Sequence, residues 1–427
     1  MSFSWRESKL FKNIASIGLV QLANYIIPMI ILPFVTRALG KAEFGSVSYA
    51  QTLITYLTLI VTYGYEYSAT QDVALNREHK DALRTIFWTV VRSRLRLFGL
   101  TMLILLVLYA VMPRVHENPS LYLAAAMINL GIALYPTWFF QGMEQMEKMA
   151  VANFLIKSMG GLLIVWLVTT PADGVLYLSI LSLAYVLVGA GTLLYVMQRF
   201  DMRPLTRPDA ALAKRVVGRG FPIFLNNMFV SAYTIMGITI LGFYVADDQL
   251  GIYSGSYRIV MAVMTLTNAP INIGLFPSMS RKFGESAAEG WRYFDRSLLA
   301  VAGFGTAVSV AVWIFAPLAV GVLLGGEFKE SVGLLRLFAV LPLLVIVASL
   351  LTVQGLYGLQ RQRYAPYVGA TVAALNIVLS LLLIPRFGIY GAAYAWIACQ
   401  LCEIAVSGSI LLALRRSRGR DSGTLKP

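Results

Sequence analysis

The stretch that decides the fold is residues 390–414, YGAAYAWIACQLCEIAVSGSILLAL, which RRSRGR follows directly at residues 415–420. Its only charged side chain is Glu403. A helix that spans the hydrocarbon core of a bilayer needs about 20 mostly apolar residues, and basic residues gather at the cytoplasmic ends of such helices. This stretch therefore predicts a membrane-spanning helix that ends on the cytoplasmic side.

The rest of the chain has the same character. Of its 427 residues, 58% are hydrophobic and 13% are charged, and the mean hydropathy is +0.70. Soluble domains carry about 25% charged residues, so this composition cannot supply a water-facing surface and lipid must be the main solvent. The net charge of +14 fits basic cytoplasmic loops, and we expect no nucleic-acid partner.

The composition and run lengths predict an all-α integral membrane protein with about 12 transmembrane helices. The run at 86–111 opens with Arg92, Arg94 and Arg96, so its first part is predicted to lie at the interface. No short apolar core with a small-residue cleavage site follows the N-terminus, so we expect an uncleaved first helix. The predicted spans are 14–37, 44–65, 86–111, 121–141, 150–170, 175–197, 220–245, 251–276, 297–318, 331–355, 365–385 and 390–414.

The loop charges predict the orientation. With the N-terminus inside, every inner segment carries Lys or Arg. The outer segments carry only Arg37, Lys41, Arg114, Lys329 and Arg386. This bias predicts that both termini are cytoplasmic.

Two short matches suggest an internal repeat. FGSVS at 44–48 matches LGIYS at 250–254, and QGMEQ at 141–145 matches YGLQR at 357–361. Because each half contains six predicted spans, the halves would be parallel repeats related by an axis along the membrane normal. The predicted domains are an N-terminal lobe at 1–198, a cytoplasmic linker at 199–213, a C-terminal lobe at 214–414 and a basic cytoplasmic tail at 415–427.

The sequence lacks the motifs of a motor or an enzyme. It has no Walker-type glycine loop, and His79 and His116 have no neighbouring metal ligands in the sequence. Cys399 and Cys402 lie inside one apolar run and are read as small packing residues rather than as a disulfide or metal pair. We expect no catalytic residues, no metal and no cofactor.

Charged residues inside predicted spans are the first candidates for function, because a charge at the bilayer centre costs about 2.5–3.5 kcal/mol and usually faces a cavity or a partner. Glu403, near the middle of the last span, is either an ion-coupling carboxyl that carries a proton or a helix-packing hydrogen-bond group. Glu66 ends the second span and is either a gating residue, a partner of Arg84 or Arg77, or an interfacial group in an aromatic belt.

Two buried basic residues are candidates for binding an anionic substrate. Arg258 in the eighth span could pair bidentately with a pyrophosphate or an acidic sugar, and Lys157 in the fifth could act as a point charge. The alternative for each is snorkelling toward the nearer headgroups, which is favoured for Lys157 but not for Arg258. Four polar residues open the first spans of the two halves and suggest a shared cavity or helix–helix hydrogen bonds; they are Gln21, Asn24, Asn226 and Asn227.

At this point the sequence resembles a known family. LPFVTRALG at 32–40 followed by Phe44-Gly45, and PTWFFQG at 136–142 followed by EQM at 144–146, look like Wzx-type O-antigen and polysaccharide flippases. This family belongs to the superfamily of multidrug extruders and peptidoglycan-precursor flippases. The resemblance implies two six-helix lobes around a central cavity and transport by alternating access.

The resemblance also implies a substrate and a location. Family members turn an undecaprenyl-pyrophosphate-linked oligosaccharide from the inner to the outer leaflet of the bacterial inner membrane for O-antigen, lipopolysaccharide or exopolysaccharide biosynthesis. They are coupled to an ion gradient, use basic cavity residues, and act among membrane lipids with a polymerase and a chain-length regulator. Arg258, and then Lys157, best fit the basic cavity role.

Two other functions stay open at the sequence level. A cation-coupled drug or metabolite antiporter of the extruder type would share the two lobes, but such proteins usually need acidic cavity residues, whereas the buried charges here are mixed. A membrane-embedded sugar transferase or polymerase would need a catalytic acid near a loop, such as Asp173, Asp247 or Asp248. The short loops make that platform poor, so we favour the flippase.

Overall fold

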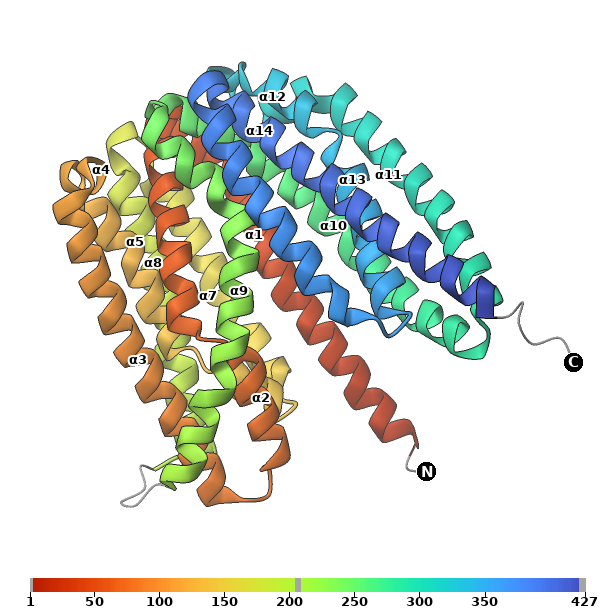
Figure 1. The fold of residues 1–427 in the computed structure, drawn as a ribbon. Helices are drawn as coiled ribbons and strands as arrows, with labels where there is room; N and C mark the ends of the chain where they lie inside the picture. Colours follow the sequence, from red (N-terminus) through yellow and green to blue (C-terminus); the bar gives the residue numbers. More distant parts are fainter. Residues whose placement is uncertain (1–2, 204–208, 422–427) are drawn as a thin grey trace, which may run out of the picture. The chain divides into compact units, whose positions relative to one another are not determined.

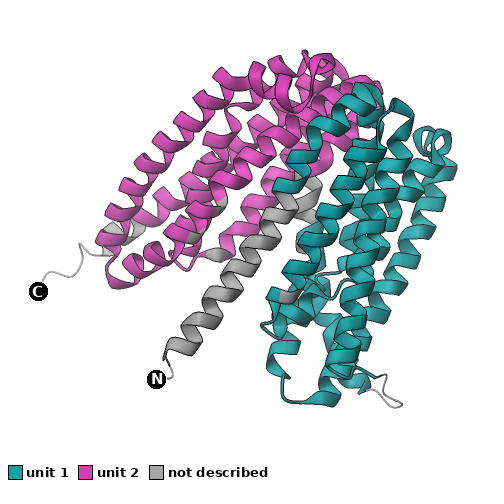
Figure 2. Cartoon of the chain, turned by 180° about the vertical axis from the view of Figure 1, so that it is seen from behind, with its two compact units in different colours: residues 1–228 teal, residues 229–427 magenta. Residues whose placement is uncertain are grey.

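The computed structural model describes residues 3–203 and 209–421, apart from the side chains of residues 3–25, 148, 226, 229–234, 269, 273, 362 and 417–421. The chain forms two compact units, Met1–Met228 (unit 1) and Phe229–Pro427 (unit 2) (Figure 2). The division falls within one long helix, Ala210–Tyr244 (α9). The predicted domain limits at 199–213 and 414 stay predictions.

Unit 1 is a bundle of helices joined by short turns (Figure 1). Before α9 its elements are α1 (Phe3–Thr62), α2 (Tyr65–Leu75), α3 (Lys80–Val111), α4 (Pro113–Glu117), α5 (Pro119–Leu134), α6 (Thr137–Gly142), α7 (Met146–Leu167), η1 (Pro171–Asp173) and α8 (Gly174–Arg199).

Unit 2 continues after α9 in the same helical style. Its elements are α10 (Asp247–Glu285), α11 (Ala287–Leu323), η2 (Gly326–Phe328), α12 (Ser331–Phe338), α13 (Leu341–Ser349), the π-helix η3 (Leu350–Tyr357), η4 (Gln362–Tyr364) and α14 (Ala365–Asp421).

The number of spans agrees with the sequence prediction. Within the described residues, nine helical segments are long and apolar enough to cross a membrane, and two of these, Ile26–Leu75 and Ala365–Arg416, are of double length. Each double segment is kinked at a glycine with positive φ, Gly40 (φ 68°) and Gly388 (φ 54°), a conformation that costs glycine little. With α9, the chain has about twelve transmembrane helices and is a multi-pass membrane protein.

One predicted boundary needs correction. The helix predicted at 86–111 is continuous from Lys80 to Val111, and Arg94 is only 1% exposed. Arg94 therefore points into the protein core, whereas Arg92 and Arg96 are exposed, and the interfacial position of this part of the helix stays a prediction. The difference follows from the helical period, because residues two apart point to nearly opposite faces of a helix.

The closest helix contact in unit 1 joins α5 and α8, which run side by side (Figure 1). A Cβ atom added at Gly131 would clash with the backbone of Tyr185, and one added at Gly189 would clash with the carbonyl oxygen of Gly131. Small residues allow such close backbone approach between membrane helices. This contact fixes α5 against α8 just before the turn that leads into α6.

The same kind of turn ends the fourth span of the chain, which lies in unit 1, and the tenth span, which lies in unit 2. Glu144 and Gln360 have positive φ values of 56° and 58°. In each turn the next residue donates its backbone N–H five residues back, from Gln145 to Phe140 at 2.9 Å and from Arg361 to Leu356 at 2.7 Å. All of these pairs are 216 positions apart, so the structure confirms the sequence match at this turn.

The helix before each turn is irregular at a matching place. In unit 1 the chain leaves the helix at Tyr135 and Pro136, between α5 and α6. In unit 2 the matching segment is the π-helix Leu350–Tyr357. Such departures from regular α-helix leave backbone groups or side chains in unusual positions and are frequent at functional sites.

Candidate functional site

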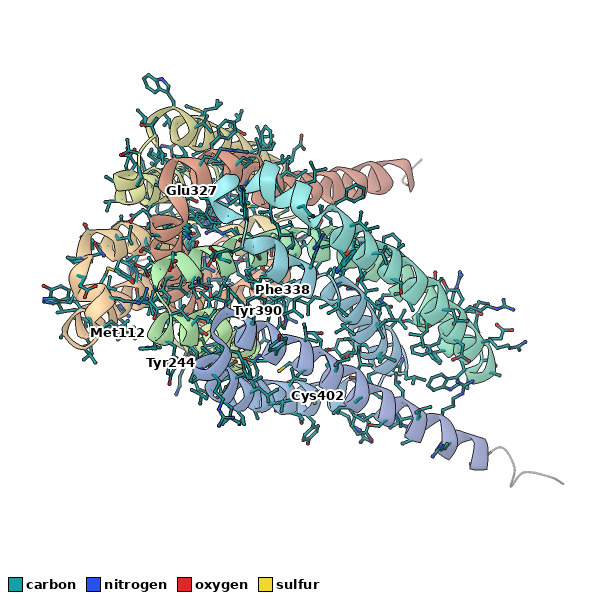
Figure 3. All side chains as sticks on the ribbon, turned by 90° about the horizontal axis from the view of Figure 1, so that it is seen from above. Met112, Tyr244, Glu327, Phe338, Tyr390 and Cys402 are labelled. Carbon is teal, nitrogen blue, oxygen red and sulfur yellow. The ribbon has the colours of Figure 1, made fainter. Side chains whose placement is uncertain are left out.

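A cavity of about 470 Å³ lies within unit 2, between α10, the α13–η3 segment and α14. Glu403 of α14 lines it, one residue after Cys402, which is labelled on that helix in Figure 3. The other polar lining residues include Asn268, Asn272, Ser349, Thr352 and Gln400. The cavity places the predicted ion-coupling carboxyl beside space that water or an ion can enter.

Glu403 is held by hydroxyl groups. Thr352 Oγ1 donates to Glu403 Oε1 at 3.4 Å, and it is 3.1 Å from Ser407 Oγ, so Ser407 can donate to Thr352 in turn. In the part of the chain that the structure describes, no lysine or arginine forms an ion pair with Glu403. The Thr352 contact is long, so it is a weak hydrogen bond. This favours the interpretation of Glu403 as a carboxyl that exchanges protons with water in the cavity.

A second polar group in this unit centres on Asn272. Its Oδ1 accepts hydrogen bonds from Ser349 Oγ and Gln354 Nε2, both at 3.0 Å, and its amide donates to Asn268 at 3.3 Å. Gln354 belongs to the π-helix and is fully buried. The sequence interpretation missed these amides, although an amide inside an apolar run is the signal that could have found them.

The described residues contain no cluster of three or more His, Cys, Asp or Glu that could hold a metal ion. Cys399 and Cys402 are both free thiols.

Unit 1 contains the other predicted acid, Glu66 of α2, and its partner is not one of those expected. Arg94 Nη2 of α3 is 2.6 Å from Glu66 Oε1, and Thr137 Oγ1 of α6 donates to Glu66 Oε2 at 2.5 Å. The prediction of Arg84 or Arg77 as its partner is wrong. Those two arginines pair instead with acids outside the spans, Asp201 and Glu144 respectively.

The break between α5 and α6 explains why Arg94 is buried. Pro136 has no N–H and interrupts the helix, so carbonyl groups of the preceding turn lose their helical partners. Arg94 Nη1 donates to Tyr135 O at 3.0 Å and to Ile132 O at 3.4 Å. One guanidinium therefore satisfies both the carboxylate and the open end of α5.

The two candidate substrate-binding cations lie in different surroundings. Lys157 Nζ is 4.7 Å from the centroid of the Tyr185 ring and 3.5 Å from its hydroxyl, which is a cation–π arrangement. Arg258 is half-buried on α10. It does not line the Glu403 cavity, although the ring of its neighbour Tyr257 packs at 5.4 Å against Trp396, which does.

The polar residues predicted to share a cavity are only partly described. Asn227 is half-buried on α9. The side chains of Gln21, Asn24 and Asn226 lie outside the described residues. Their common cavity stays a prediction.

The fold is that of a known class of transporters. A solved structure described as an inward-facing multidrug resistance MATE family transporter of the MOP superfamily has a TM-score of 0.65, with 12% sequence identity over 95% of this chain and 99% of that one. The lipid II flippase MurJ, in an inward closed conformation, has a TM-score of 0.69, with 11% identity over 94% of this chain and 87% of that one. Identities this low show a shared fold alone.

The sequence comparison is more specific. The family described as "Polysaccharide biosynthesis protein" matches residues 10–283, so the chain belongs to that family. A protein of Escherichia coli (strain K12) named "Putative O-antigen transporter" is 25% identical over 409 residues, which cover 96% of this chain and 97% of that protein. The family resemblance found in the sequence is confirmed.

Proposed function

We propose that the protein is a flippase that carries a lipid-linked oligosaccharide repeat unit from the cytoplasmic to the outer leaflet of the bacterial inner membrane. Three findings support this: the family membership, the name of the E. coli relative, and the fold shared with a lipid II flippase. The names of these relatives also support a transporter rather than an enzyme. The proposed carrier lipid is undecaprenyl pyrophosphate, and both termini are proposed to be cytoplasmic.

The observation that carries the mechanism is the position of Glu403 in the cavity of unit 2. An acid that lines a cavity inside apolar helices, beside a hydroxyl and with no basic partner among the described residues, can exchange a proton with water that enters. Its protonation changes the charge inside unit 2, and a ligand that binds one arrangement better than another shifts the population toward it. We propose that this proton step couples an ion gradient to alternating access.

The basic residues provide the proposed contacts for the substrate. A pyrophosphate is costly to take out of water, so a cation along its path lowers the barrier. Arg258 is proposed for that role because guanidinium binds phosphate bidentately, and Lys157 is proposed as a second positive charge. The Glu66–Arg94 pair is proposed to hold α2, α3 and α6 together during transport. A polymerase and a chain-length regulator are the proposed partners.

The test of the function is the sidedness of the lipid-linked repeats in cells depleted of the protein. An impermeant glycosidase added outside should find them protected, because the repeats stay on the cytoplasmic side. Re-expression of the wild-type chain should restore external access. If depletion leaves the usual sidedness, the flippase proposal fails, and transport of cationic drugs becomes the next assay because the MATE transporters share the fold.

The test of the coupling step uses Glu403→Gln, with Glu147→Gln at an exposed position of α7 as the control. We expect the rate of translocation by the Glu403 variant to fall about tenfold, within the range of typical coupling free energies, and to lose its dependence on external pH. The control should keep both. A Glu403→Gln variant that retains the wild-type pH profile would remove Glu403 from the mechanism.

A further inference from the structure

A cavity of about 640 Å³ lies within unit 1, between α3 and the first turns of α9. Four of its lining side chains are basic: Arg84, Arg92, Arg96 and Lys214. No acidic side chain is among its described lining residues. This cavity is separate from the Glu66–Arg94 pair, and the mechanism proposed above does not use it.

The charge of the cavity is only partly neutralised. Arg84 pairs with Asp201 at 2.8 Å. A hydrogen bond from Lys80 holds the pKa of Asp201 below its usual value, which keeps that acid ionised and paired. In the described part of the chain, no carboxylate pairs with Arg92, Arg96 or Lys214. Three cations therefore share one concave space, an arrangement that favours a ligand with more than one negative charge.

Neutral groups in the same cavity suit a phosphate. Thr85, Thr89 and Ser93 line the cavity one helical turn apart along α3, and Ser93 Oγ is 2.7 Å from the Tyr65 hydroxyl. Arg92 lies 5.5 Å from the centroid of the Trp88 ring, which leaves its donor edge available. Guanidinium and hydroxyl donors of this kind bind phosphate oxygens with charge-assisted hydrogen bonds.

The surface of α3 beyond the arginines is apolar. Leu100, Leu103 and Val107 follow Arg92 and Arg96 on one face of the helix, at the spacing of successive turns, and all three are exposed. A single helix face thus changes from cationic to apolar along its length. This order matches a molecule with an anionic headgroup and a long hydrocarbon chain, whereas a free phosphate would use only the first part.

We propose that this cavity binds the diphosphate headgroup of a polyprenyl lipid, with the hydrocarbon chain lying along α3. A phosphodiester lipid carries one negative charge, whereas a diphosphate carries at least two and better matches the three cations. The choice of a polyprenyl lipid rests on the proposed function. The site would capture the carrier lipid from the membrane and would be distinct from the cavity that contains Glu403.

The first test measures binding of farnesyl diphosphate, a short polyprenyl diphosphate, to the full-length protein in phosphatidylcholine nanodiscs. We expect the double variant Arg92→Gln/Arg96→Gln to bind about tenfold more weakly or worse, because two charge-assisted contacts are lost. The control is Arg292→Gln/Arg296→Gln, an exposed arginine pair with the same spacing on α11. Equal affinity of the two double variants would overturn the proposal.

A second variant tests the cavity without changing charge. Gly218 lines the cavity, and a Cβ atom there meets nothing within 4 Å, so Gly218→Leu fills space without a clash at its first side-chain atom. We expect weaker binding of farnesyl diphosphate and an unchanged melting temperature. Wild-type affinity in this variant would show that the ligand lies elsewhere.

Competition identifies the ligand chemistry. Farnesyl diphosphate should displace a labelled analogue at lower concentration than inorganic diphosphate or phosphatidylglycerol. Equal potency of inorganic diphosphate would reduce the site to one for soluble anions, and equal potency of phosphatidylglycerol would remove the preference for diphosphate; either result overturns the proposal. Arginine-dependent binding together with normal lipid sidedness after depletion would sink the proposed function and leave this site standing. If depletion changes the lipid sidedness but binding does not depend on the arginines, only the proposed site is overturned.

Discussion

Each unit has a polar cluster beside its own irregular helix segment, but the two clusters consist of different groups. Glu66 and Asn272 are 206 positions apart, as are Phe44 and Leu250 in the sequence repeat. In unit 1 the acid at this position is paired with the buried Arg94. In unit 2 the matching residue is a neutral amide, and an acid from another helix, Glu403, lines the same cavity.

The difference teaches what each cluster can do. A buried ion pair is costly to separate, because removing one partner leaves the other charge without compensation. It therefore holds helices in a fixed relation. An acid whose hydrogen bond, among the described residues, comes from a hydroxyl can gain or lose its proton without breaking an ion pair, so its charge can change. The ion pair of unit 1 is therefore suited to hold helices together, whereas the acid of unit 2 is suited to change its protonation state.

The largest effect is expected from breaking the ion pair of unit 1. Arg94→Met removes the ion-pair partner of Glu66, which keeps its hydrogen bond from Thr137, and removes the guanidinium donor to the carbonyls of Ile132 and Tyr135. We expect the free energy of unfolding to fall by about 2 to 3 kcal/mol, since Glu66 is partly solvated. Thermal unfolding in detergent, followed by size-exclusion chromatography, measures it.

Two further variants serve as comparisons for the Arg94→Met protein. Arg92→Met removes the same charge from an exposed position of the same helix and should leave the melting temperature close to that of the wild type. Adding Glu66→Met to Arg94→Met should recover part of the loss, because the unpaired charge is gone. If the Arg94→Met protein has the same melting temperature as the Arg92→Met protein, the Glu66–Arg94 ion pair does not stabilise unit 1.

A smaller effect is expected in unit 2, where the cluster is neutral. Asn272→Leu removes the acceptor of Ser349 and of the buried Gln354, and we expect a loss of about 1 to 2 kcal/mol in the free energy of unfolding. Ser349→Ala removes only one of the two donors and should cost less. If Asn272→Leu proved as damaging as Arg94→Met, the contrast between the two clusters would not hold.

The smallest effect concerns the turn that both units share. Gln360→Gly removes a side chain from a left-handed residue and should raise the free energy of unfolding by about 0.5 to 1 kcal/mol. Glu144→Gly should give almost no gain, because it also removes the 2.7 Å ion pair with Arg77, and exposed pairs are worth up to about 1 kcal/mol. Chemical denaturation in mixed micelles compares the two; equal gains would mean that the Arg77 pair contributes nothing.

The sequence predicted the features that depend on local composition. Hydropathy is a property of each run by itself, so the number of spans could be predicted, whereas the joining of two spans into each double-length segment was not predicted. The repeated turn was visible because Gly142 and Gly358 stand in matching motifs. Glu403 was identified for the same reason, as a charge isolated within an apolar run, and the structure places it in a cavity.

The partners of these residues were harder to predict, because they come from distant helices. Arg94 was grouped with Arg92 and Arg96 as an interfacial run, although the helical period separates it from them by about 200° and would have turned it to the core. The cluster at Asn272 depends on Gln354, which lies in a π-helix. A local change of helical period moves side chains to a face that a regular 3.6-residue pattern does not indicate.

The close contact at Gly131 and Gly189 has a mechanical consequence. No side chain separates the two backbones at this contact. We therefore expect α5 and α8 to move together as one rigid pair. We expect this helix pair to bend at its end, at Tyr135 and Pro136, where the helix is already interrupted and Arg94 binds the open carbonyls. The buried guanidinium of Arg94 thus lies between α5 and α6, where we expect it to limit the movement of α6 relative to α5.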